Sequence, residues 1–398
     1  MGGMRVLFLS GLYSTPMAPS MGVCNARVLH AMREYADIRV MAPLPWYPGP
    51  VVRRNPALRA VAELPSVQRD DDGSIVRHPR RLHVPRFYAL HAALYAASVL
   101  VPVAAEIKRF RPDVLFSAWA YPDGTAATML GKLFGLPTVV RALGSDINDF
   151  AQRRWRRPQI AWAMQHADRV VAVSAALGRE IEKLGVDSGR IAVIPTGVDC
   201  SAFHPVMMSE ARRSLGLPQG PLIVVPSRLS REKGIGYFIE ALAMMDQTVS
   251  TVLVGHGPEE QALRDRAAAL GVAERVRFAG FQPEANMKLF YSAADVVCLP
   301  SLEEGWPNVL VESFACGCPV VASDVGGVSE IISLTGAGAM APPGDSNALA
   351  SALTDALARP WNREDTARTM QHYTLAQTAR QYSEICEEVA LHPSSFAA

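Results

Sequence analysis

The chain has 398 residues, of which 49% are hydrophobic, 19% charged and 7% aromatic. This length exceeds one ordinary hydrophobic core and predicts two domains, and the composition excludes a disordered chain. The formal net charge of +1 excludes a protein that binds nucleic acid through its overall positive charge.

The first residues, MGGMRVLFLS, pass directly into an apolar run, without the hydrophobic segment and cleavage site of a secretory signal. The six cysteines include no C-x-x-C pair, and Cys316 and Cys318 have no second pair at zinc-binding spacing. We therefore expect buried, reduced thiols and a cytoplasmic protein. The inner face of the cell membrane is the second location that we consider.

In the first half of the chain, short apolar runs alternate with segments of helical length. The expected strands are residues 5–10, 38–42, 114–116, 138–141, 169–173 and 191–194. Residues 87–105 carry no formal charge over a length that could span a membrane, but they are rich in alanine and include His91 and Pro102. Such residues insert poorly, so the segment predicts a packed helix and not a transmembrane span.

The same pattern restarts after a break at residues 204–221, which are rich in turn formers. The expected strands of this second half are residues 222–226, 251–254, 276–279, 296–299 and 320–322. These runs are apolar throughout, which predicts parallel strands covered by helices on both faces. Two doubly wound halves follow, and their ligands are expected beyond the carboxyl ends of the strands.

Two cations follow the first strand of the second half, in the segment SRLSREKG. Arg228 and Lys233 stand there just before a helix, which suits an anion such as a diphosphate. Arg231 and Glu232 lie in the same segment, so an ordinary solvated loop is the alternative.

Two carboxylates eight residues apart follow a later strand, in the segment EEGWPNVLVESFACG. Gly305 and Pro307 shape a loop, and Asn308 is the expected N-cap of a helix over residues 309–316. Glu304 then lies in the loop and Glu312 near the second turn. Because neither is at the cap, this spacing favours ligand binding over helix capping.

These segments together resemble the donor half of the retaining glycosyltransferases of family 4, which have the GT-B fold. The resemblance rests on SRLSREKG, GHGP, RVRFAGF, AADVVCLPSLEEGWPNVLVESFACGCPVVASDVGGVSEII and PPGD, in family order over residues 222–345. Looser matches are MRVLFLSGLYS, SMGVCNARVLHAM, RPDVLFSAW and VVRALGSDIN in the first half. The resemblance implies an α/β protein of two doubly wound Rossmann-like domains facing across a cleft.

It also implies a division of labour between the domains. Residues 1–203 would bind the acceptor, and residues 204–375 would bind the nucleotide-sugar donor. The amphipathic last helix, about residues 376–398, would pack back on the first domain.

The roles of the charged residues follow from the same resemblance. Glu304 corresponds to the first acid of the family's E-x7-E motif, which holds donor-sugar hydroxyls near the reacting carbon. Glu312 corresponds to the second acid, which binds the ribose. Arg228 and Lys233 match the pair of cations that holds the leaving diphosphate.

The backbone groups expected at the donor lie in three loops. Gly22 matches the glycine that lets the backbone approach the phosphates, and residues near Phe281 are expected at the base. Further donor contacts are expected from residues 305–309: Gly305, Trp306, Asn308 and Val309, but not Pro307, which has no N–H.

The chain departs from the family at one position. Many relatives carry a histidine where this chain has Leu143, in RALGSD. Asp146 remains, and we expect it to be catalytic or to contact the acceptor. Arg141 is expected either to contact a substrate or to make a structural ion pair.

The resemblance thus predicts a retaining, metal-independent glycosyltransferase without a cofactor. We expect a UDP-sugar over a GDP-sugar as donor, and a glycan or lipid-linked acceptor of bacterial envelope or exopolysaccharide synthesis. Basic residues 153–162 and 107–112 would suit an anionic membrane surface, with solvated helix faces as the alternative.

Other functions remain open at this point. A glycosidase also uses two carboxylates, and a nucleotide-sugar epimerase or a non-catalytic nucleotide-sugar binding protein could share the fold. A dinucleotide oxidoreductase is disfavoured because no G-x-G-x-x-G follows the first strand.

Overall fold

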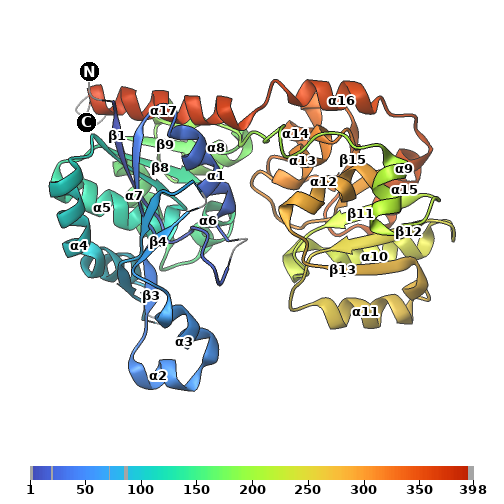
Figure 1. Cartoon of the computed structure of the whole chain (residues 1–398), viewed down its shortest axis with the longest axis horizontal. Coiled ribbons are helices and arrows are strands. Elements are labelled where there is room, and N and C mark those ends of the chain that lie inside the picture. The colour runs from blue at the N-terminus through green and yellow to red at the C-terminus, as the bar shows by residue number, and fades with distance from the viewer. Residues whose placement is uncertain (1–2, 19–20, 71, 85–87, 393–398) are drawn as a thin grey trace. The chain divides into compact units, whose positions relative to one another are not determined.

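The computed structural model describes all residues except 1–2, 19–20, 71, 85–87 and 393–398 (Figure 1). The chain forms two compact units: unit 2 is Thr196–Thr374, and unit 1 comprises the chain before it and the chain from Leu375 onward. The first boundary therefore lies at Pro195, earlier than the expected residue 203. Val198 and Phe203 pack into the core of unit 2, which explains the difference.

Among the described residues, unit 1 holds an eight-stranded sheet in the order β10-β9-β8-β7-β1-β2-β5-β4. Neighbouring strands are parallel except β4 and β5. A separate parallel pair joins β3 and β6. The strands are β1 (Arg5–Leu9), β2 (Asp37–Met41), β3 (Leu44–Trp46), β4 (Val67–Arg69), β5 (Ile75–Arg77), β6 (Arg80–Leu82), β7 (Val114–Ala118), β8 (Thr138–Ala142), β9 (Arg169–Ala172) and β10 (Ile191–Val193).

The described part of unit 2 holds a six-stranded parallel sheet in the order β13-β12-β11-β14-β15-β16. Its strands are β11 (Leu222–Pro226), β12 (Ser250–Val254), β13 (Val276–Gly280), β14 (Val296–Leu299), β15 (Val320–Ser323) and β16 (Gly338–Ala341). The strand order reverses between β11 and β14. Ligands of doubly wound sheets bind at such a point, beyond the carboxyl ends of the strands.

Helices connect the strands in both units. In unit 1 they are α1 (Val23–Met32), α2 (Gly49–Arg54), α3 (Pro56–Glu63), α4 (His91–Phe110), α5 (Thr125–Phe134), α6 (Ser145–Asn148), α7 (Arg157–His166), α8 (Ala175–Glu182) and α17 (Leu375–Leu391). In unit 2 they are α9 (Met208–Leu215), α10 (Ile235–Met244), α11 (Glu260–Ala269), α12 (Glu284–Ala293), α13 (Asn308–Ala315), α14 (Val328–Thr335), α15 (Ser346–Ala358) and α16 (Arg363–Met370).

The strands bury both of their faces. In β11, Val224 lies in one hydrophobic cluster of unit 2, while Ile223 and Val225 lie in the other. In β1, Val6 and Phe8 face one cluster of unit 1, and Leu7 and Leu9 face another. Burial on both faces is the reason why these strands are apolar throughout.

Two helices of unit 1 bear on the sequence expectations. The terminal helix α17 packs against α1 within unit 1 (Figure 1). Helix α4 begins within the uncharged segment of residues 87–105 and continues to Phe110. It packs against α5 and buries Tyr95, Val99 and Val103. Of the helices in the described chain, none is both long enough and apolar enough to cross a membrane.

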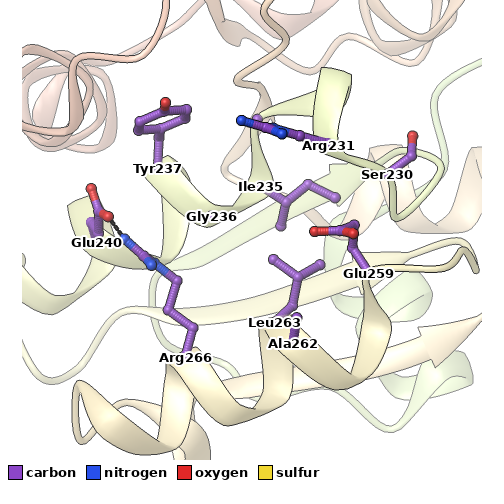
Figure 2. A pocket seen from close by; sticks show the side chains of 11 residues that line it. Ser230, Arg231, Ile235, Gly236, Tyr237, Glu240, Glu259, Ala262, Leu263 and Arg266 are labelled. Atoms are coloured by element: carbon purple, nitrogen blue, oxygen red, sulfur yellow. Dashed lines mark ion pairs between the residues drawn. The ribbon is translucent and has the colours of Figure 1, made fainter.

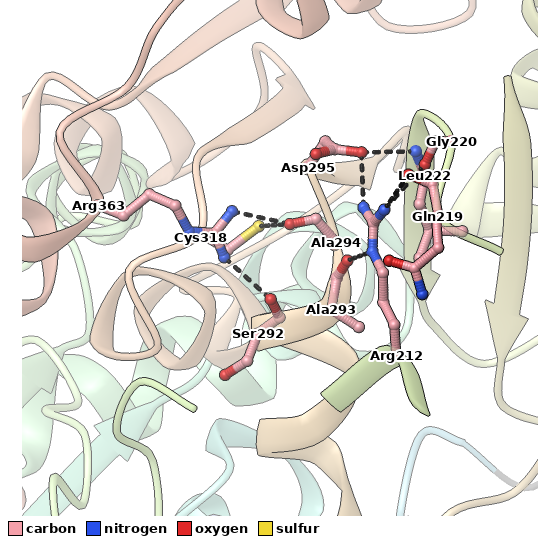
Figure 3. Close-up of polar contacts among 10 residues, drawn as sticks. All are labelled: Arg212, Gln219, Gly220, Leu222, Ser292, Ala293, Ala294, Asp295, Cys318 and Arg363. Atoms are coloured by element: carbon pink, nitrogen blue, oxygen red, sulfur yellow. Dashed lines mark hydrogen bonds and ion pairs between the residues drawn. The ribbon is translucent and has the colours of Figure 1, made fainter. Parts of the chain in front are cut away.

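A buried polar network holds the amino ends of β11 and β14 together (Figure 3). Arg212 of α9 pairs with Asp295 at 2.9 Å, and Asp295 accepts the backbone N–H of Leu222 at 2.7 Å. Arg212 and Arg363 donate to the carbonyl groups of Ala293 and Ala294 at the end of α12. Cations at the carboxyl end of a helix are stabilising, and this network fixes the two strands whose loops form the candidate site.

Candidate active site

Two charged side chains predicted to bind the donor meet beyond the carboxyl ends of β11 and β14. Lys233 Nζ lies 2.7 Å from Glu304 Oε1. The Glu304 side chain is 10% exposed and that of Lys233 is 25% exposed, so solvent screens the pair only in part. The structure thus places the cation expected at the diphosphate and the carboxylate expected at the donor sugar side by side.

Close backbone packing holds the Glu304 loop in place. Gly326 has φ +55°, and a Cβ atom there would lie 1.9 Å from the carbonyl oxygen of Glu304. The neighbouring Gly327 donates its N–H to the carbonyl of Gly305 at 3.0 Å. Only glycine permits both this φ and this approach, so the GG pair positions the first acid of the motif.

Arg228 occupies the exposed part of the loop after β11. Burial raises the pKa of the nearby Glu232, but the Ser230 hydroxyl and the charges of Arg228 and Lys233 outweigh it, and the net pKa is lowered. The loop therefore carries cations whose field already stabilises negative charge. A diphosphate would meet the same field.

Glu312 lies in the second turn of α13, as predicted. Its Oε2 accepts a hydrogen bond from the hydroxyl of Tyr291, which is fully buried on α12, at 2.7 Å. Tyr291 was not singled out in the sequence, because beside Phe290 it reads as an ordinary core residue. It orients the carboxylate that is expected to bind the ribose.

The helix after the Glu304 loop begins one residue earlier than expected. Asn308 is the first residue of α13 and not its N-cap, which is Pro307. Proline has no N–H and fixes φ, so it suits a position next to the start of a helix. Asn308 and Val309 form the first turn, where N–H groups and the helix dipole attract anions.

Two aromatic residues flank this site in different ways. Trp306 donates its indole N–H to the carbonyl of Thr196 at 2.9 Å and packs against the core, so its side chain supports the loop. Phe281 follows β13 and is 51% exposed, with its ring against that of His256. An exposed ring at the carboxyl edge of the sheet can stack on a base.

Gly22 lies in unit 1 directly before α1. It has φ +73°, and a Cβ atom there would lie 2.5 Å from backbone atoms of Leu12 and Tyr13. Asn25 holds the same loop by donating to the carbonyl of Leu12 at 2.7 Å, and Arg141 donates to Asn25 at 3.1 Å. Arg141 is thus a buried structural residue whose ring contact is with Tyr382.

Asp146 is buried in unit 1 and binds the backbone. Its carboxylate accepts N–H groups of Ala120 at 2.7 Å, Gly144 at 2.8 Å and Leu143 at 3.1 Å. Burial raises its pKa, although these N–H groups act against it. This geometry favours a residue that positions the loops after β7 and β8, while a catalytic role stays a prediction.

Asp146→Ala is expected to lower the free energy of unfolding by about 2–4 kcal/mol, because it leaves buried N–H groups without an acceptor. Urea unfolding measures this loss. The control is Asp149→Ala, which removes an exposed pair with Arg153 and should cost about 0.5 kcal/mol or less. If Asp146→Ala keeps full stability and loses only kcat, the positioning role is wrong and the catalytic one stands.

Two family models match the chain. The model of glycosyltransferase family 4 matches residues 43–202, and the model of glycosyl transferases group 1 matches residues 207–373. The chain belongs to glycosyltransferase family 4. The protein is an enzyme that transfers a glycosyl group.

Three similar proteins each match this chain over more than nine-tenths of its length. TuaC of Bacillus subtilis, named for glycosyl transfer in teichuronic acid biosynthesis, is 28% identical over 92% of this chain and 94% of its own length. Sucrose-phosphate synthase of Thermosynechococcus elongatus has a TM-score of 0.79 at 20% identity and covers 97% of this chain and 99% of its own. HepE of Anabaena in complex with UDP has a TM-score of 0.74 at 22% identity, and the match covers 97% of this chain and 100% of HepE. The fold is GT-B.

A cavity of about 270 Å³ lies beside the cation-bearing loop, between α10 and α11 (Figure 2). Arg231, Tyr237 and Glu259 line it, and Glu240 pairs with Arg266 at its side. None of the residues that the family resemblance assigns to the donor lines this cavity. It is separate from the Lys233–Glu304 pair.

The acidic segment of residues 70–73 lies between β4 and β5. Asp70 accepts the hydroxyl of Tyr13 at 2.5 Å, and Asp72 accepts the N–H of Ser74 at 2.8 Å and lies 2.9 Å from a ring nitrogen of His30. Asp71 lies outside the described residues.

Proposed function

We propose that this glycosyltransferase moves a sugar from a UDP-sugar to a glycan or lipid-linked acceptor of polysaccharide synthesis, with retention of anomeric configuration and without a metal. The Lys233–Glu304 pair carries the proposal. It joins a cation for the leaving diphosphate to a carboxylate for the donor sugar, at the edge of the sheet where ligands bind.

The chemistry needs stabilisation of the departing group. As the bond between the anomeric carbon and the diphosphate oxygen breaks, negative charge grows on the diphosphate. Arg228, Lys233 and the N–H groups at the start of α13 supply fixed positive charge there, which is the role that a metal ion fills in other enzymes. The acceptor oxygen attacks the same face of the sugar and gives its proton to the departing diphosphate oxygen.

The donor assignment rests on the ribose and base positions. Glu312, oriented by Tyr291, can accept both ribose hydroxyl groups. Phe281 offers a ring for the base. UDP is the nucleotide bound by the similar HepE, and polysaccharide synthesis is the setting in which the similar TuaC is named.

Transfer from an α-linked UDP-sugar is expected to give an α-linked product. The coupling constant of the anomeric proton, measured by proton NMR of the product, reports the configuration. An envelope extract of the producing cell supplies the acceptor. A β-linked product would reject retention, and a sugar that changes without an acceptor would indicate an epimerase instead. Full activity in the presence of EDTA is expected, and its loss on chelation would reject metal independence.

We also propose contact with anionic membrane through a smaller patch than the sequence suggested. Arg153 pairs with Asp149, Arg156 lies 4.3 Å from the ring centre of Phe150, and Arg157 donates to backbone carbonyls. Arg154 and Trp155 remain as an exposed basic and aromatic pair, with Trp155 56% exposed.

Arg154→Glu combined with Trp155→Ala is expected to lower binding to phosphatidylglycerol vesicles several-fold, because each basic residue near an anionic surface contributes about 1 kcal/mol. Co-sedimentation measures the binding. Arg179→Glu, an exposed change on α8, is the charge-matched control. Equal loss in both variants, or no loss, would remove the proposed patch.

A further inference from the structure

One arginine of unit 1 has two buried nitrogen atoms that make no hydrogen bond within the described part of the chain. The Nε and Nη1 atoms of Arg81, on β6, are buried and have no hydrogen-bond partner among the described residues. Its guanidinium carbon lies 5.1 Å from the centre of the Tyr95 ring, and the residue as a whole is still partly exposed. Buried donors without an acceptor are costly, so such a group calls for an explanation.

A carboxylate beside Arg81, that of Asp123, is hydrogen-bonded to other groups. Asp123 accepts the backbone N–H of Gly11 and the hydroxyl of Tyr95, the latter at 2.9 Å. It makes no ion pair with Arg81 within 4 Å and is buried. Burial raises the pKa of Asp123 and the charge of Arg81 acts against this effect. The Nε and Nη1 atoms of Arg81 nevertheless have no acceptor in the described chain, beside Gly11 and Asp123 in the loops after β1 and β7.

A row of rings extends from this point. His83 and His91 share a hydrogen bond of 3.1 Å between ring nitrogens, and their ring centres lie 4.9 Å apart. Tyr47 packs against His83, and Tyr121 packs against His91, both at 5.7 Å. The rings meet edge-on, and His91 and Tyr121 are buried, whereas Tyr47 and His83 are partly exposed. The exposed parts of Tyr47 and His83 are therefore the surfaces that a ligand can reach.

A second guanidinium group lies at the far side of the row. Arg156 lies over the rings of Tyr88, Phe150 and Tyr121. Burial, followed by the positive charges of Arg81, His83 and Arg156, lowers the pKa of His91 to about 4. The pKa of His83 is lowered as well, by burial and then by the charge of Arg81. Arg81 therefore acts on both imidazoles, and Arg156 acts on that of His91.

The adjoining backbone is strained. Trp119, which directly follows β7 and precedes the Tyr121 loop, has φ +77°. A bulky residue adopts this conformation only where its surroundings enforce it, and such residues gather at binding sites. The N–H of the next residue, Ala120, is held by Asp146.

We propose that Arg81, with Arg156, His83 and His91, binds an oxyanion carried by the acceptor, a phosphate or a sugar carboxylate. The inference rests on the proposed function, because it treats the ligand as an acceptor. Two guanidinium groups supply charge, the imidazoles supply hydrogen bonds, and the partly exposed rings of Tyr47 and His83 contact the sugar. The acceptor is thus an anionic glycoside.

Proton–carbon NMR of the histidine side chains in the full-length protein tests this site. His83→Gln and His91→Gln identify the two signals among the nine histidines. Inorganic phosphate, glucose 6-phosphate and glucuronate are each titrated, with glucose as the neutral match. The anions are expected to shift both signals saturably and to raise the pKa of His91, while glucose does neither. A response to phosphates but not to glucuronate identifies the anion as phosphate.

Arg81→Gln is expected to weaken these responses at least tenfold, while Arg179→Gln, an exposed change in the same unit, leaves them intact. Arg81→Lys should restore part of the affinity, and circular dichroism confirms that each variant is folded. A response that Arg81→Gln leaves unchanged, or that UDP produces as well, overturns the assignment. UDP calorimetry on the wild type separates the outcomes, because UDP binding without a histidine response to any of the anions rejects this inference and leaves the donor site standing.

Discussion

Lys233→Ala is expected to lower kcat by on the order of 10²–10³, the loss seen when one preorganised charge-stabilising donor is removed from an enzyme. Lys233 is proposed to supply positive charge where the diphosphate departs, and its Nζ also lies 2.7 Å from Glu304 Oε1. The substitution thus removes the charge and releases the carboxylate that is expected to orient the sugar. Steady-state transfer from a UDP-sugar measures the effect.

Arg231→Ala is the matched control for this prediction. Arg231 belongs to the same loop and carries the same charge, but it lines the separate cavity between α10 and α11. Its removal should change kcat by less than about threefold, since it alters only a screened field. Equal losses for both variants would show that loop charge in general, and not the Lys233 position, supports catalysis.

The sheet of unit 2 was predictable because both of its faces are buried. The five expected strands β11 to β15 lie within one residue of their expected bounds. Strand β16 was missed because its sequence, GAMA, has no β-branched residue. The three-residue strands β4, β5 and β6 were missed because their charged residues hide the apolar signal.

The predicted site residues are placed by different contacts, and these contacts could not be predicted from sequence. Spacing alone indicated that Glu304 and Glu312 bind a ligand, but not that Lys233 contacts the first or that Tyr291 contacts the second. Asp146 looked like an active-site acid, whereas its carboxylate faces three backbone N–H groups. The sequence motif shows which residue type stands at a position, and only the fold shows which groups its side chain contacts.

The cluster around Arg81 was beyond sequence analysis for a related reason. Its four charged or imidazole side chains come from β6, the residue after β6, the first residue of α4 and the residue before α7. Arginine in a chain with 39 Lys and Arg residues carries no signal of its own. The unpartnered nitrogen atoms are visible only once the strands are paired.

Glu312→Ala is expected to weaken UDP binding about 100-fold, because two hydrogen bonds from ribose hydroxyls to a charged acceptor contribute about 1.5–3 kcal/mol each, and part of this returns as solvation of the free nucleotide. Calorimetric titration of the wild type with UDP, GDP and ADP, without added metal, should show one preferred base, and we expect uracil. Glu312→Ala should lose affinity for all three nucleotides alike, since the ribose is common to them.

Tyr291→Phe distinguishes this contact from a general disturbance of α13. It removes only the hydroxyl that donates to Glu312 at 2.7 Å and keeps the buried ring. We expect a loss of UDP affinity of about fivefold, the effect of one hydrogen bond of about 1 kcal/mol that orients the carboxylate. If Glu312→Ala binds UDP as tightly as the wild type while Tyr291→Phe is destabilised, then Glu312 is a structural partner of Tyr291 and the ribose must be held elsewhere. Loss in the order Glu312→Ala, then Tyr291→Phe, with unchanged thermal stability, would establish the second acid of the motif as the ribose ligand in this chain.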